Sequence, residues 1–373
     1  MKVVYISIED LTPRIQRDWY LKDLIELNHE VVFWVYGNYF DHKINKSLIP
    51  VLKLDSKKKL IHELRKTIPC ETRYIILIPY DGRFVELFRA LKIYKCETYF
   101  FSWGAIPSQK SSESILNKIL EKKINIKTFF NLYYLIKLKI SHSIGYTVGF
   151  NKIFTSGALI KQQFINSNCK IIETHLPDYD NYLNSNIFNS SKKYAIFLDV
   201  NLPFHDDLKF NGLKQIKQNN YFNTLNNYFD HLEKKYSVKI IIALHPTVLV
   251  ENYKCLNREM YIGNTPELVK GAEFVISHHS TSISYAIFGY KPIILIYTNE
   301  YKQMYEKTFF LQLKMQYLLL ACDLVNIDKV YNHAPNLNVN YKLYDSYKYN
   351  YIVSKKTEQF LARNIFLNNI MKF

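Results

Sequence analysis

The sequence predicts an α/β protein with two doubly wound domains, each a parallel sheet covered by helices on both faces. The chain has 373 residues, more than the ~250 to 300 at which a single hydrophobic core stops growing. Short β-rich runs alternate with helical segments in both halves of the chain, and this alternation is typical of parallel sheets. A polar stretch without periodicity, "NSNIFNSSKK" at residues 184–193, separates the two halves.

The first half opens with a strand, a helix and a second strand. The run "KVVYISI" (2–8) is β-rich, apolar residues then recur at helical spacing from Ile15 to Leu27, and "EVVFWVY" (30–36) follows. Further predicted strands are "RYIILIPY" (73–80), "ETYFFSWG" (97–104) and "NKIFTSG" (151–157), with a helix over "GRFVELFRALKIY" (82–94). We assign residues 1–185 to an N-terminal Rossmann-like domain.

The second half repeats the pattern. Predicted strands are "YAIFLDV" (194–200), "VKIIIAL" (238–244), "EFVIS" (273–277) and "PIILIY" (292–297). Predicted helices cover residues 220–236, 265–272 and 281–289. We assign residues 186–345 to a C-terminal Rossmann-like domain and expect residues 346–373 to include a helix that packs back on the first domain. Two such sheets would hold ligands in the cleft between them, at the carboxyl ends of their strands.

Charge and cysteine content narrow the classes of partner. The net charge of +16 suggests a polyanionic partner, but no nucleic-acid-binding module is visible, so we expect no nucleic acid. The five cysteines are scattered without a CxxC pair, which indicates neither a disulfide framework nor a zinc site. The N-terminus lacks a signal-peptide pattern and no apolar run could span a bilayer. We therefore expect a cytoplasmic protein.

Two polar motifs follow predicted strands of the second domain. His245-Pro246-Thr247 comes directly after "IIIAL", and "HHSTS" (278–282) comes after "FVIS" and opens a predicted helix. Hydroxyl groups and free backbone N–H groups would converge there, where the helix dipole favours an anion. We predict a phosphate-binding site; the alternative is a helix cap beside histidines satisfied in a turn. The binding candidates are His245, Pro246, Thr247, His278, His279, Ser280, Thr281 and Ser282, with Asp199 and His205 from the loop "FLDVNLPFHDDL", which is otherwise a solvated loop. We interpret "DYDNYL" (178–183) similarly, as a loop near the hinge between the domains.

These motifs resemble a known family. The order "ALHPT" then "ELVKGAEFVISHHSTSISYAIFGYKPII" looks like the donor half of GT-B glycosyltransferases of bacterial surface-polysaccharide synthesis, in particular sialyltransferases and polysialyltransferases that use CMP-activated sugars. "YAIFLDVNLPFHDDL" and "HLPDYDNYL" resemble uncharacterised proteins of capsule and O-antigen (lipopolysaccharide) clusters. The resemblance covers roughly residues 190 to 300 and is weaker in the N-terminal half.

The resemblance implies a fold, a reaction and roles for individual residues. The fold would be GT-B, and the protein would be an inverting, metal-independent glycosyltransferase that moves a sugar from a CMP donor to a surface glycan. The sugar would be a nonulosonic acid (sialic, pseudaminic or legionaminic acid) or Kdo. His245 would hold the CMP phosphate and help it leave, while Ser280, Thr281 and Ser282 would bind the same phosphate. Because the leaving group carries one phosphate, such donors suffice, and we expect no essential metal and no cofactor besides the nucleotide-sugar co-substrate.

The catalytic base should come from the N-terminal domain, from which the acceptor approaches. Asp81 in "LIPYDGRF" resembles the acidic motif that supplies the base in those sialyltransferases, although Tyr80 replaces its first acidic residue. Asp-Gly is also a turn signal, so a structural turn is the alternative. Glu9 and Asp10, after the first strand, are the other candidate bases, because a carboxylate within hydrogen-bond reach can deprotonate an acceptor hydroxyl.

Several alternatives stay open. The donor could be a UDP-sugar or a polyol phosphate, the reaction could be that of a nucleotide-sugar 2-epimerase, or the chain could be a non-catalytic GT-B-like assembly protein. The acceptor would be a glycan or a lipid-linked glycan. The segment from Ile115 to Ile140 interleaves apolar residues with Lys118, Lys122, Lys123, Lys127, Lys137 and Lys139. It predicts peripheral binding to the anionic inner face of the cytoplasmic membrane; the alternative is a solvated surface helix.

Overall fold

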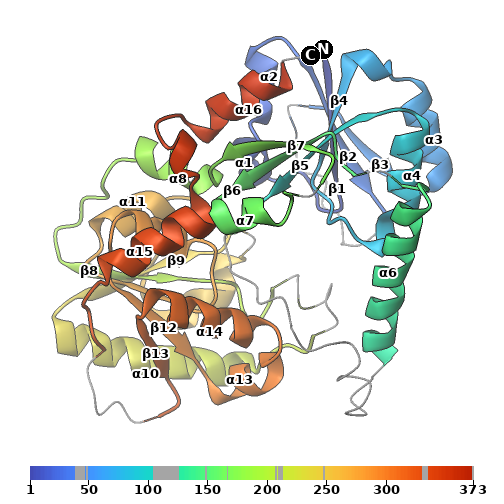
Figure 1. Ribbon diagram of the computed structural model, residues 1–373. Helices are drawn as coiled ribbons and strands as arrows, with labels where there is room; N and C mark the ends of the chain where they lie inside the picture. The colour runs from blue at the N-terminus through green and yellow to red at the C-terminus, as the bar shows by residue number, and fades with distance from the viewer. Residues whose placement is uncertain are drawn as a thin grey trace.

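The computed structural model describes residues 1–37, 47, 49–103, 126–147, 149–165, 167–205, 208, 213–246, 248–329 and 335–371. Two parallel sheets, one above the other in Figure 1, each carry helices on their faces. This arrangement confirms the predicted fold class of two doubly wound α/β domains. No helix of the described residues is long and apolar enough to cross a membrane.

The N-terminal sheet has the strand order β3-β2-β1-β4-β5-β6-β7, and all its pairings are parallel. Its strands are β1 (Lys2–Ser7), β2 (Glu30–Tyr36), β3 (Val51–Leu54), β4 (Thr72–Ile76), β5 (Glu97–Ser102), β6 (Lys152–Ser156) and β7 (Lys170–Thr174). Its helices are α1 (Pro13–Asp18), α2 (Leu21–Glu26), α3 (Lys57–Arg65), α4 (Val85–Ile93), α6 (Ile126–Ser143) and α7 (Ala158–Gln162), with short helical turns η1 (Pro69–Glu71) and η2 (Gly82–Phe84). The chain reverses direction across the sheet between β1 and β4, and ligands bind at such a switch point.

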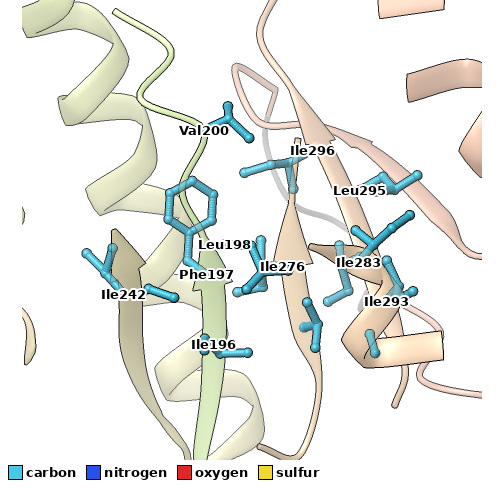
Figure 2. Close-up of a cluster of buried hydrophobic side chains, with 14 of the residues drawn as sticks. Ile196, Phe197, Leu198, Val200, Ile242, Ile276, Ile283, Ile293, Leu295 and Ile296 are labelled. Carbon is cyan, nitrogen blue, oxygen red and sulfur yellow. The ribbon is translucent and has the colours of Figure 1, made fainter. Parts of the chain in front are cut away.

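The C-terminal sheet has the order β10-β9-β8-β11-β12-β13, again all parallel. Its strands are β8 (Tyr194–Leu198), β9 (Lys239–Leu244), β10 (Glu259–Ile262), β11 (Val275–Ser277), β12 (Ile293–Tyr297) and β13 (Asp323–Asn326). The central strands β8, β11 and β12 are apolar on both faces, as buried parallel strands are. Figure 2 shows Phe197, Ile276 and Leu295 among the side chains that form this core together with Ile283 of α12.

The helices of the C-terminal half begin with α8 (Pro177–Asn184), which includes residues 178–183 that the sequence predicts as a loop near the hinge. The remaining helices are α10 (Gln218–Tyr236), α11 (Thr265–Gly271), α12 (Ile283–Phe288), α13 (Asn299–Tyr305), α14 (Phe309–Leu320), α15 (Tyr341–Tyr347) and α16 (Ala362–Ile370), with short helical turns η3 (Val250–Leu256), η4 (Lys348–Ile352) and η5 (Lys355–Thr357). Pro177 occupies the first turn of α8, where proline is tolerated. The loop prediction was therefore wrong for residues 178–183.

The first predicted helix is broken in two. Tyr20 has the left-handed conformation (φ 58°) and separates α1 from α2. The Tyr20 ring is buried, and it packs on Phe366 of α16 with ring centroids 5.3 Å apart. Burial of this aromatic ring offsets a backbone conformation that is unfavourable for a tyrosine.

The chain returns to the N-terminal domain at its C-terminal end. Helix α16 contributes Phe366 and Ile370 to the core of the first sheet, and Figure 1 shows it beside α2. The carboxylate of Asp180 accepts hydrogen bonds from the backbone N–H groups of Ala362 and Arg363, both at 2.9 Å. The Asp180 side chain of α8 therefore caps α16. This contact joins the segment by which the chain leaves the first domain to the segment by which it returns.

Candidate active site at the domain junction

His245 follows the last residue of β9 and lies at the carboxyl end of the C-terminal sheet. Its backbone N–H donates to Oδ2 of Asp199 at 3.2 Å, and its ring centroid lies 5.5 Å from that of His205. Burial lowers the pKa of His245, with smaller contributions from the charges of His205 and Arg14, to about 3. The imidazole is therefore neutral at physiological pH, so it can act as a hydrogen-bond donor but not as a cation. Pro246 is exposed beside it, and Thr247 lies outside the described residues.

Asp199 forms hydrogen bonds that hold this loop in place. Its Oδ1 accepts from the hydroxyl of Tyr253 at 3.1 Å, and its Oδ2 accepts from the His245 backbone. Burial raises the pKa of Asp199 to about 6, against the hydrogen bonds that lower it. Both carboxylate oxygens are thus used within the protein. These contacts favour a role for Asp199 in positioning the His245 loop, and its direct contact with a substrate stays a prediction.

The two adjacent histidines after β11, His278 and His279, form different contacts. The His278 side chain has 0% exposure. Its Nδ1 donates to the carbonyl of Ile296 at 2.7 Å, and its Nε2 therefore accepts from the hydroxyl of Tyr221 at 2.9 Å. Both ring nitrogens are engaged in the core, and burial lowers the pKa to about 4. These two hydrogen bonds favour a structural role for His278, and its role in binding substrate stays a prediction.

His279 points toward the other strand-end loops. Its ring stacks on Phe309 at 4.2 Å between centroids, and the centroid of the His205 ring lies 6.2 Å from that of Phe309. Nδ1 of His279 is hydrogen-bonded to the hydroxyl of Tyr301 at 2.8 Å. Burial, with His278 and His205, lowers the pKa of His279 well below its usual value. Three imidazoles from three loops, those of His205, His245 and His279, thus gather at this edge of the sheet.

The three hydroxyl residues after His279, which are Ser280, Thr281 and Ser282, differ in burial and in hydrogen bonding. Oγ of Ser280 accepts from the backbone N–H of Ser282 at 3.2 Å, and its carbonyl accepts from Nε2 of Gln316 at 3.1 Å. Thr281 is exposed and Ser282 is half-buried. Helix α12 begins only at Ile283, and Ser282 provides no side-chain cap. Ser280 therefore shapes the loop, while Thr281 and Ser282 have hydroxyls near its surface.

Asp81, the first candidate base, is engaged in its own turn. Its Oδ1 accepts from the backbone N–H of Arg83 at 2.7 Å and from Nε at 3.0 Å, and its Oδ2 accepts from Nη2 at 3.0 Å. Gly82 packs on α6 so closely that a Cβ there would lie 2.0 Å from the Tyr134 carbonyl oxygen. These contacts favour the turn interpretation, and a role as base stays a prediction. Glu9 and Asp10 follow β1, where the backbone N–H of Glu9 donates to Oγ of Ser7 at 2.9 Å.

Two charged side chains at the junction were not predicted. Asp178 of α8 accepts from Oγ of Ser284 at 2.5 Å and from the hydroxyl of Tyr285 at 3.3 Å. Arg14 of α1 comes from the other domain, and its charge acts on both Asp178 and His245. Only the topology brings Arg14 and Asp178 to the same junction, because they lie more than a hundred positions apart in the sequence. The proline that starts α8 was the signal that Asp178 lies on a helix.

Asp178 and Asp180 have the Asp-x-Asp spacing that some transferases use to hold a metal. In this chain the second carboxylate caps α16 and the first is bonded to α12, so they do not converge on one point. Within the part of the chain that the structure describes, no group of three or more His, Cys, Asp or Glu side chains could hold a metal ion.

Comparisons with known proteins define the fold. No protein-family model matches the chain, and no curated protein shows significant sequence similarity to it. Among solved structures, the wall teichoic acid polymerase TagF (H548A) has 11% identity and a TM-score of 0.50 over 98% of this chain and 89% of that one. UDP-GlcNAc 2-epimerase from Methanocaldococcus jannaschii has 12% identity and a TM-score of 0.46 over 93% of this chain and 98% of that one.

The arrangement of the two sheets and the last helix assigns the chain to a known fold class. Two parallel Rossmann-like sheets in tandem, with the last helix returned to the first domain, are the GT-B architecture. The chain has the GT-B fold. At such low identities the likeness extends to the fold alone, so the activity has to be argued from the site.

Proposed function

We propose that the protein is a glycosyltransferase whose C-terminal domain binds a nucleotide-sugar donor. The observation that carries the proposal is the meeting of three loops at the carboxyl ends of adjacent strands. His205 follows β8, His245 follows β9 and His279 follows β11, and β8 lies between the other two strands. Open α/β sheets bind their ligands at this edge.

The neutral imidazole of His245 suits the departure of a phosphate. Transfer breaks the bond between the anomeric carbon of the donor and a phosphate oxygen, and that oxygen gains negative charge as the bond breaks. An N–H donor already aimed at this oxygen stabilises the transition state without a reorganisation cost. The hydrogen bond from the backbone N–H of His245 to Asp199 fixes the position of the His245 backbone, from which the imidazole side chain extends. A carboxylate of the N-terminal domain, Asp81, Glu9 or Asp10, would take the proton of the attacking acceptor hydroxyl.

The donor that we propose is a CMP-linked sugar, because the His-Pro and Ser/Thr motifs resemble those of CMP-sugar-dependent sialyltransferases. The sugar would be a nonulosonic acid or Kdo, and the acceptor a surface glycan. A UDP-sugar or polyol-phosphate donor is the alternative, since the same three loops could bind either. A reaction that expels a single phosphate needs no metal clamp, and we propose metal-independent inversion.

Nucleotide binding and one substitution test the proposal. Thermal-shift and calorimetric titration of the full chain with CMP, CDP, UDP and GDP should show stabilisation by CMP. Stabilisation by UDP instead would favour the alternative donor, and stabilisation by none would overturn the proposal. His245→Ala should lower the rate of donor turnover ~100 to 1000-fold while the melting temperature stays near that of the wild type. Turnover at the wild-type rate would show that His245 takes no part in the reaction.

We also propose that helix α6 holds the protein at an anionic membrane surface. Tyr133, Ile136 and Ile140 are exposed and follow one another at helical spacing, so they form an apolar stripe on one side of α6, and the exposed Ile144 follows directly after the helix. Lys137 and Lys139 lie beside this stripe. In Figure 1 α6 runs along the outer edge of the N-terminal domain. An apolar stripe flanked by lysines is typical of helices that lie in a membrane interface.

Vesicle sedimentation tests this location. Lys118, Lys122 and Lys123 lie outside the described residues, and the side chain of Lys127 is not described, so the test uses α6 itself. Lys137→Glu/Lys139→Glu should reduce binding to phosphatidylglycerol-containing vesicles, because a lysine near an anionic surface contributes ~1 kcal/mol. Lys234→Glu/Lys235→Glu on α10 is the charge-matched control and should bind like the wild type. Equal binding to neutral and anionic vesicles, or a matching loss in both variants, would refute the proposal.

A further inference from the structure

The two ring nitrogens of His279 lie in different surroundings. Nδ1 is hydrogen-bonded to the hydroxyl of Tyr301 at 2.8 Å. Nε2 has no hydrogen-bond partner among the described residues, yet it is not one of the fully buried polar atoms that lack a partner. His279 is only 6% exposed, so this small exposed area includes Nε2. A ligand at this edge of the sheet can therefore reach Nε2 of His279.

The ring of His279 belongs to the same group of strand-end rings as His245. It stacks on Phe309 with 4.2 Å between centroids, and the His205 ring lies 6.2 Å from that Phe309 ring. The rings of His205 and His245 are in turn 5.5 Å apart. These contacts place His279 in the candidate site together with the residue that we propose for the leaving group.

Tyr301 is held firmly in α13, behind His279. Its side chain is buried, and its backbone N–H donates to Oγ1 of Thr298, the N-cap of that helix, at 3.0 Å. Its ring stacks on His278 at 5.3 Å and meets the Tyr305 ring edge-on at 5.4 Å. Burial raises the pKa of Tyr301 well above its usual value, so the hydroxyl keeps its proton. Tyr301 therefore presents an O–H group to His279 from a fixed position.

The hydroxyl of Tyr301 determines which nitrogen of His279 carries the ring proton. Among the described residues, Nδ1 of His279 is the single hydrogen-bond partner of this hydroxyl. If Nδ1 carried the ring proton, the buried O–H would have no acceptor, which is unfavourable. If Nδ1 accepts instead, the O–H is satisfied and the proton of the neutral ring is on Nε2. Nε2–H is therefore a hydrogen-bond donor at the surface of the candidate site.

The neighbouring histidine has the opposite tautomer. Nδ1 of His278 donates to the carbonyl of Ile296 at 2.7 Å, and Nε2 of His278 accepts from the hydroxyl of Tyr221 at 2.9 Å. A tyrosine hydroxyl thus donates to each of the two histidines, but to a different ring nitrogen. Of these two arrangements, the one at His279 leaves an N–H donor for a ligand.

We propose that Tyr301 is a positioning residue that prepares Nε2–H of His279 to donate to the phosphate of the nucleotide donor. This inference rests on the proposed function and deepens it, because it adds a second neutral N–H donor to that of His245. Phosphate oxygens without a proton only accept hydrogen bonds, so the opposite tautomer would place a nitrogen lone pair against them. A donor that is oriented before the ligand binds costs no reorganisation. Tyr301 acts through His279 and does not contact the ligand.

Calorimetric titration of the full-length chain with CMP against cytidine, and with UDP against uridine, isolates the phosphate contact. His279→Asn should weaken binding of the nucleotide about 10 to 100-fold, the usual effect of a hydrogen bond to a charged group. Its amide is too short to reach the position of Nε2. Nucleoside binding should not change. His279→Gln should recover part of the lost affinity, because its longer side chain can place an N–H donor near that position.

Two phenylalanine variants form a matched pair that tests Tyr301. Tyr301→Phe and Tyr221→Phe each remove one buried hydroxyl that donates to a histidine of the same loop. Tyr301→Phe should weaken nucleotide binding about 2 to 10-fold, the usual effect of one neutral hydrogen bond, and leave nucleoside binding unchanged. Tyr221→Phe should bind nucleotide like the wild type. Thermal denaturation should show a similar loss of stability in both, so a difference in affinity does not arise from folding.

NMR spectra of the imidazole nitrogens report the tautomer independently of any ligand. In the wild type, His279 should have its proton on Nε2 and His278 on Nδ1, with the signals assigned by their absence in His279→Gln and His278→Ala. A proton on Nδ1 of His279 would overturn this inference alone. So would a Tyr301→Phe variant that binds nucleotide like the wild type or that loses nucleoside binding equally. A wild-type protein that binds no nucleotide would overturn the proposed function and this inference together.

Discussion

His278→Ala separates a structural histidine from a binding one. The substitution leaves the Tyr221 hydroxyl without its acceptor and the Ile296 carbonyl without its donor, both inside the core. Each unsatisfied buried group costs about 1 to 3 kcal/mol, and the lost ring also leaves a cavity beside Tyr301, whose ring stacks on it at 5.3 Å. We expect the free energy of unfolding to fall by about 3 to 5 kcal/mol.

Urea denaturation at pH 7 measures this change, with Thr281→Ala as the control from the same loop. Thr281 is exposed, so its substitution should alter the free energy of unfolding by less than about 0.5 kcal/mol. Nucleotide affinity of folded His278→Ala should stay within a few-fold of the wild type. A variant that keeps the wild-type stability but loses nucleotide affinity would refute the reasoning, because it would place the ring in the ligand site.

The pH dependence of the free energy of unfolding, compared between wild type and His278→Ala, gives a second test. The pKa of His278 is about 4 in the folded protein and about 6.5 in an unfolded chain, so the unfolded state binds the proton first as the pH falls. The contribution of this neutral imidazole is complete above pH 6.5 and is lost between pH 6.5 and 4. The stability gap between wild type and His278→Ala should therefore narrow over that range. A gap that widens on acidification would show that the folded protein favours the charged ring.

Three further substitutions test other parts of the structure. Gly82→Ala should destabilise the docking of α6, because its Cβ would meet the Tyr134 carbonyl at 2.0 Å; faster limited proteolysis near α6 checks this, and an unchanged cleavage pattern would contradict the close contact. Asp180→Ala should cost about 1 to 2 kcal/mol, since two N–H groups at the start of α16 lose their acceptor; thermal denaturation measures it, and full stability would show that water replaces the cap. Asp81→Asn should leave nucleotide affinity intact; a fall in turnover alone would identify the base, whereas a fall in melting temperature alone would identify a turn residue.

The strands could be predicted from the sequence because their signal is local. Runs such as residues 194–198 and 292–297 are apolar without interruption, as buried parallel strands are, and the alternation of such runs with helices predicts the doubly wound topology. The break at Tyr20 could not be predicted, because tyrosine rarely adopts the left-handed conformation. It depends on Phe366, a residue at the far end of the chain.

The site was predictable in position but not in the orientation of its side chains. Strand ends in the second domain identified His245 and the loop 278–282. Which of two adjacent histidines enters the core depends on Tyr221 and Ile296, elements that contact the loop only in the folded protein. Arg14 was missed for a related reason, since its relation to His245 exists only across the junction of the two domains.

The return of α16 to the first sheet has a consequence for synthesis on the ribosome. Phe101 and Phe154 stack on each other, and Phe366 covers them with its centroid 5.6 Å from each ring. Until α16 leaves the exit tunnel, this aromatic surface of the nascent first domain has no cover. The C-terminal domain can complete its own core earlier, because its strands are all translated before α16. The domain that is made first is thus finished last, and over that interval its exposed rings are a surface at which the nascent chain can aggregate.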